Sequence, residues 1–153
     1  MKTFGRIVLV LLFLCAGSLV RVSPAQAAES CHKVNAKGVG QDLGNGTTVA
    51  NIIGGGLLQG TTAGNFVISG GAFPVFSIAG TVKFTTNKAT LTVTITGSFD
   101  VSTGQFSATG PVTEATGKLA GATGSLVLSG LENLADGSFV EDVTGRICVD
   151  LAP

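Results

Sequence analysis

The chain is poor in the residue types that most often carry chemistry. Its 153 residues include one histidine and neither tryptophan nor tyrosine, and charged residues make up only 12%. A single imidazole gives no basis for a histidine-rich metal site or a Ser-His-Asp arrangement. The sequence also lacks a Gly-x-Ser-x-Gly elbow and a Gly-Lys-Ser/Thr phosphate loop. We therefore expect no metal and no cofactor, and no hydrolase of these classes.

The first 27 residues have the pattern of an export signal. Two basic residues precede an apolar stretch at 7–20, and Ala25-Gln26-Ala27 supplies the small-x-small motif of a signal-peptidase site. The apolar stretch falls short of the roughly 20 residues that a transmembrane helix needs. We expect cleavage near Ala27 and a mature chain, 28–153, that forms one domain without a membrane anchor. Its location would be periplasmic or extracellular.

Little basic charge remains once the predicted leader is removed. Three of the nine basic residues belong to the leader, so the mature chain has six basic and nine acidic residues. Nucleic-acid binding needs a basic face to neutralise phosphates. The net charge of about −3 argues against nucleic acid as a partner.

Two cysteines, Cys31 and Cys148, lie near the two ends of the mature chain. Because disulfides persist in exported proteins, we expect this pair to be bonded and to tie the first structural element to the last. A bridge that closes so long a loop is worth about 4 to 5 kcal/mol on the chain-entropy model. The alternative is two free thiols. Metal binding is disfavoured because no Cys-x-x-Cys spacing is present.

The mature sequence reads as a succession of strands. Residues 89–96 alternate strictly, which places Ala89, Leu91, Val93 and Ile95 on one face and four threonines on the other. Similar alternation, interrupted by glycine-rich turns, predicts eight strands and no helix. These lie near residues 32–40, 48–59, 64–69, 74–85, 89–101, 105–114, 118–130 and 138–149.

An all-β meander whose first and last strands are joined by a disulfide is most simply a closed barrel. Closure pairs both edge strands, which an exported β protein must otherwise protect. The prediction is a single eight-stranded antiparallel up-and-down β-barrel. The run Gly54-Gly55-Gly56 is expected to break or kink the second strand.

Residues 112–126 read VTEATGKLAGATGSL. This segment resembles a stretch of dirigent proteins and allene oxide cyclases that reads Gly-Gly-Thr-Gly-Lys/Arg-Phe and then Gly-Ala-x-Gly. Glu114-Ala115 stands where those families have two glycines, and Leu119 replaces their aromatic residue. The resemblance implies a secreted member of the allene oxide cyclase/dirigent-like barrel superfamily. It carries no catalytic residue over to a position of this chain.

The same resemblance implies a function that leaves no recognisable catalytic motif in the sequence. In those families an eight-stranded barrel encloses an apolar cavity, where a reactive intermediate is steered without a cofactor. The bound species are phenoxy radicals in dirigent proteins and a fatty-acid epoxide in the cyclases. An apolar small molecule is accordingly the expected partner of this chain.

Candidate site residues follow from strand parity. Inward-facing phenylalanines would line the lumen, namely Phe76, Phe84, Phe99, Phe106 and Phe139. Glu141 shares the inward parity of Phe139 and Val143. If buried, it would have a raised pKa and could act as an acid or base. If it lies at the rim with its carboxylate in water, the more usual place for a glutamate, it would be an ordinary surface group.

Two function classes stay open at this point. The chain is either a barrel that binds an apolar molecule and steers its cyclisation or coupling, or a non-catalytic exported barrel that carries a ligand or has a structural role. A wide lumen with converging polar groups would favour the first class. A lumen filled by the phenylalanines would favour the second.

Overall fold

The computed structural model describes residues 30–150, all of them in one β-rich domain. The predicted leader and its cleavage site lie outside this range. The strands are β1 (Ser30–Gly44), β2 (Thr47–Gly54), β3 (Gly60–Ala72), β4 (Val75–Thr85), β5 (Ala89–Asp100), β6 (Gln105–Gly117), β7 (Thr123–Glu132) and β8 (Ser138–Val149).

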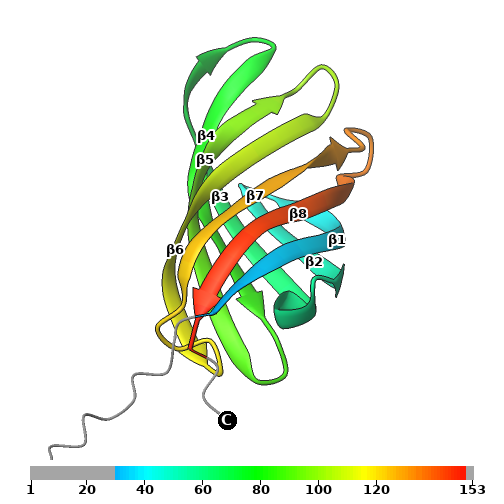
Figure 1. Cartoon of the computed structure of the whole chain (residues 1–153). Helices are drawn as coiled ribbons and strands as arrows, with labels where there is room; N and C mark the ends of the chain where they lie inside the picture. Colours follow the sequence, from blue (N-terminus) through cyan, green and yellow to red (C-terminus); the bar gives the residue numbers. More distant parts are fainter. Residues whose placement is uncertain (1–29, 151–153) are drawn as a thin grey trace, which may run out of the picture.

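The eight strands form a closed antiparallel barrel in which each strand pairs with its neighbours in the sequence (Figure 1). β1 closes the barrel by pairing with β8 from Ser30↔Val149 to Gln41↔Ser138. The predicted up-and-down barrel is therefore confirmed. Closure leaves no edge strand within the sheet, which removes the usual site of strand-to-strand aggregation.

The predicted disulfide is also confirmed. Cys31 and Cys148 are bonded, face each other across the β1–β8 seam, and have Cα atoms 3.9 Å apart. The bond therefore fixes the seam at which the barrel closes. It lies at the end of the barrel where β1 begins and β8 ends (Figure 1).

Several strand boundaries differ from the predicted ranges, and those of β2 and β7 have a clear local cause. β2 ends at Gly54 instead of continuing to residue 59, because Gly54, Gly55 and Gly56 all have left-handed φ angles and lead into the short 3-10 helix η1 (Gly56–Leu58). The predicted break in the second strand is thus confirmed. β7 begins at Thr123 because residues 118–122 form a turn in which the Ala122 amide donates to the Leu119 carbonyl.

Within residues 30–150, no helix has the length and apolar character needed to cross a membrane.

The two ends of the barrel are built differently. At the end that carries the disulfide, Leu58 of η1 and Leu119 of the β6–β7 turn are fully buried and pack on the core. The inward residues of β5 continue this core, and Ala89, Leu91, Val93 and Ile95 are buried as the alternation predicts. We call this the closed end. The β1–β2, β3–β4, β5–β6 and β7–β8 turns surround the opposite end, which we call the mouth (Figure 1).

Candidate ligand-binding site

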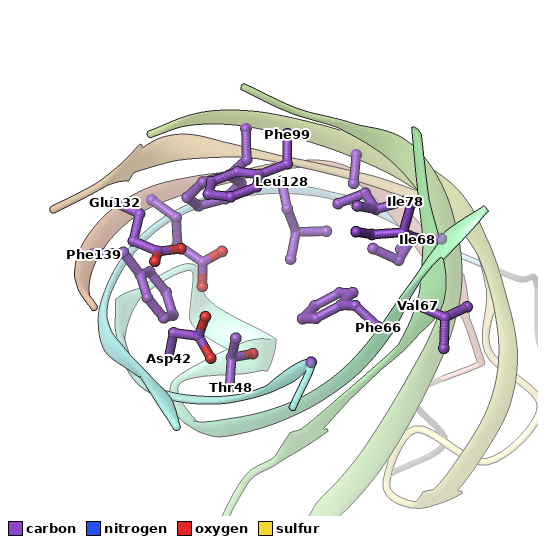
Figure 2. A pocket seen from close by; sticks show the side chains of 15 residues that line it. Asp42, Thr48, Phe66, Val67, Ile68, Ile78, Phe99, Leu128, Glu132 and Phe139 are labelled. Atoms are coloured by element: carbon purple, nitrogen blue, oxygen red, sulfur yellow. The ribbon is translucent and has the colours of Figure 1, made fainter. Parts of the chain in front are cut away.

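The mouth half of the barrel is hollow. A cavity of about 370 Å³ opens there and is lined by residues from β1 to β8 (Figure 2). This volume lies in the lower part of the range of about 300 to 1,000 Å³ that small-molecule sites occupy. The lumen is therefore packed at one end and hollow at the other.

Aromatic side chains form much of the cavity wall. Three of the predicted lining residues, Phe99, Phe106 and Phe139, lie in it. The rings of Phe106 and Phe139 meet edge to face with centroids 5.9 Å apart, an arrangement that aromatic pairs favour. Phe66 of β3 also lines the cavity, opposite Phe139 (Figure 2).

Two of the predicted lining residues, Phe76 and Phe84, are not part of the cavity wall. Phe84 is fully buried, but it lies in the packed half, paired with Leu91 toward the closed end. Phe76 lies at the end of β4 next to the β3–β4 turn and is half-buried. Parity predicts which face a side chain takes but not its height along the barrel axis, and height decides these two cases.

Glu141 lies inside the barrel, as its parity indicates. Only 7% of its surface is exposed, and it lines the cavity. Its placement at the rim with the carboxylate in water is therefore wrong. Within the described part of the chain, no hydrogen bond or ion pair to this carboxylate is found, and its oxygens keep a small surface toward the cavity.

Both cross-strand neighbours of Glu141 are glycines, and one of them makes room for its side chain. These neighbours are Gly38 of β1 and Gly130 of β7. A Cβ atom at Gly38 would lie 2.6 Å from Oε1 of Glu141, and one at Gly130 would lie 2.9 Å from its Cα. Both contacts are closer than real Cβ atoms allow. Gly38 therefore leaves the space that the carboxylate occupies, whereas Gly130 allows close approach of the β8 backbone and the Phe106 ring.

Burial changes the acid–base behaviour of Glu141. Loss of hydration raises its pKa from 4.5 to about 7, because the charged form is disfavoured away from water. A carboxyl group with this pKa exchanges its proton near neutral pH. That is the range in which a general acid or base works best.

Two further carboxylates lie closer to the mouth. Asp42 of β1 and Glu132 of β7 line the cavity on the same side as Phe139 (Figure 2). The pKa of Glu132 is raised, first by partial burial and second by the negative charge of Asp42. Glu141, Glu132 and Asp42 therefore form an acidic wall, which we define by these three residues.

The opposite wall of the cavity is apolar. It is built from Phe66 and Ile68 of β3, Ile78 of β4 and Phe99 of β5 (Figure 2). No lysine, arginine or histidine of the described chain lines the cavity. The described residues also contain no group of three potential metal ligands.

The sequence contained a signal for Glu141 but little for Phe66. Glu141 stands in a strongly alternating strand, whereas the inward positions before Phe66 on β3 are Thr62 and Gly64, so the alternation of apolar residues on that face is weak. The arrangement as a whole offers an apolar chamber, one buried proton-exchanging group and a negative entrance. Comparison with protein-family profiles, curated proteins and solved structures found no match to this chain.

Proposed function

We propose that this protein is a secreted barrel that binds an apolar small molecule in the mouth half of its lumen. The observation that carries the proposal is the half-empty interior. A small eight-stranded barrel ordinarily fills its lumen with side chains or holds one small ligand. Here the closed end is filled, while the mouth end retains about 370 Å³.

The lining supports an apolar ligand. Ten of the fifteen residues that line the cavity are apolar, and four of these are phenylalanines. Burying an apolar ligand against such side chains is favourable by about 25 cal/mol per Å² of apolar surface removed from water. Export is supported by the leader pattern and by the disulfide, which suits an oxidising compartment.

Catalysis is the further part of the proposal. The resemblance to allene oxide cyclases and dirigent proteins implies steering of a cyclisation or coupling without a cofactor. Confinement of one conformer is enough to select a stereochemical outcome. Glu141 supplies the acid or base, since it is buried in the wall and has a pKa near 7.

The alternative is a non-catalytic carrier. The observation in its favour is that most lining residues are apolar, while Glu141 is the only buried ionisable side chain among the described residues that line the cavity. The two functions differ in what Glu141→Gln does. In an enzyme this change abolishes turnover of the substrate, whereas a carrier has no turnover to lose.

Binding is tested with a neutral apolar fluorophore, N-phenyl-1-naphthylamine. We expect its emission to rise on titration with the mature protein, and to do so far less with Ile78→Trp, which places a large ring in the cavity. Ile53→Trp is the matched control, because Ile53 is 62% exposed and is not a lining residue. Equal binding by the two variants, or none by the unmodified protein, would refute the proposal.

A further inference from the structure

Charge is sorted along the barrel axis. Of the eight described acidic residues, six lie toward the mouth: Asp42, Asp100, Glu132, Asp136, Glu141 and Asp142. The basic residues of the described chain lie toward the closed end, with one exception, and are Lys33, Lys83, Lys88, Lys118 and Arg146. The exception is Lys37, on the outer surface of β1.

Lys37 does not neutralise the acidic wall. Its Nζ lies 2.6 Å from Asp142 Oδ1, and both side chains are exposed on the outside of the barrel. Strand parity points them away from the lumen, opposite to Gly38 and Glu141. The mouth therefore has a negative potential that no lining cation offsets within the described chain.

The burial of Glu141 without a partner is an independent observation that points to a ligand. Glu141 is more than nine-tenths buried, lines the cavity and has no partner in the described chain. The other charged residues that line the cavity are Asp42 of β1 and Glu132 of β7, both of its own sign. A buried carboxylate normally has a compensating partner, because burial of an unpaired charge is costly.

We propose that the ligand of this cavity is an apolar molecule that bears one positively charged group, such as an alkylamine. Its cation would pair with Glu141 on the acidic wall, and its hydrocarbon would pack against Phe66, Ile78 and Phe99 on the apolar wall. This inference rests on the proposed function and names the ligand class for the same site.

The geometry discriminates between ligands of the same shape and different charge. A carboxylate-bearing lipid would be repelled by three like charges in a poorly hydrated site. A neutral lipid would leave Glu141 unpaired. A cation gains a charge-assisted hydrogen bond to Glu141.

The proposal is tested with three ligands that share an eight-carbon chain: octylammonium, 1-octanol and octanoate. The affinity of each ligand is measured by its displacement of N-phenyl-1-naphthylamine from the mature protein. At about pH 8.5, where the amine is still protonated and Glu141 is ionised, octylammonium should bind roughly tenfold more tightly than 1-octanol. Octanoate should bind more weakly than 1-octanol. The preference for the amine should shrink at about pH 5.5, where Glu141 is protonated.

Variants assign the preference to the acidic wall. Glu141→Gln should lower the ratio of octylammonium affinity to 1-octanol affinity at least several-fold, and Glu132→Gln should lower it less. Glu114→Gln, at an exposed carboxylate of β6 toward the closed end, is the matched control and should keep the ratio. If Glu141→Gln does not fold, Glu132→Gln and the pH series carry the test.

The outcomes separate this inference from the proposed function. Binding of 1-octanol with no preference for octylammonium, or a preference for octanoate, would overturn the cationic ligand and leave the apolar site standing. Failure of all three ligands and of the naphthylamine would overturn both.

Discussion

Reduction of the Cys31–Cys148 bond is expected to lower the free energy of unfolding by about 4 to 5 kcal/mol. The two cysteines are 117 positions apart, so the bond closes almost the whole domain into one loop and restricts the unfolded chain strongly. Reducing agent should reach it, since Cys31 is exposed and Cys148 is half-buried. Urea denaturation with and without a reducing agent measures the difference.

The double variant Cys31→Ser/Cys148→Ser is the control for this experiment. Its stability should match that of the reduced protein and should not respond to reducing agent. If the reduced and oxidised forms unfold at the same urea concentration, the bond does not stabilise the seam between β1 and β8.

The stability of the protein should fall as the pH rises from about 4.5 to 7. The pKa of Glu141 is about 7 in the folded protein and 4.5 when it is hydrated, so the folded state binds more protons across this interval. Unfolding then becomes easier as protons are withdrawn, by roughly 3 kcal/mol in total, and the loss is complete above pH 7. Urea denaturation at a series of pH values measures it.

Glu141→Gln isolates this contribution. The amide keeps the shape of the side chain but does not titrate, so the variant should gain stability relative to the unmodified protein as the pH rises from 4.5 to 7. Glu114→Gln, at an exposed carboxylate, should show no such pH-dependent difference. A constant difference between Glu141→Gln and the unmodified protein over this range would mean that Glu141 is not buried in the way described.

The barrel could be predicted from the sequence because its signals are local. Alternation over residues 89–96 determines which side chains of β5 face inward, and two cysteines at the chain ends indicate which strands meet. Tight glycine-rich turns leave few other ways to connect successive strands. Each of these features involves a single strand or a single pair of residues.

The cavity could not be predicted in the same way, because it depends on position along the barrel axis. Phe84 and Phe99 have the same inward parity on adjacent strands, yet one packs the closed end and the other lines the mouth. Their heights follow from strand lengths and register, which parity does not determine. The burial of Glu141 likewise depends on a glycine of another strand, Gly38 of β1, which leaves space for its side chain.

The central claim, that the mouth half of the lumen receives an apolar ligand, is tested most directly with one introduced tryptophan. The chain has no tryptophan of its own, so Phe99→Trp places a single fluorophore in the cavity wall. Phe73→Trp is the matched control, because Phe73 is 78% exposed near the tip of the β3–β4 hairpin. Titration with 8-bromo-1-octanol, whose bromine quenches tryptophan on contact, should give saturable quenching in Phe99→Trp and only weak, linear quenching in Phe73→Trp. Equal, non-saturating quenching in both variants would contradict the claim.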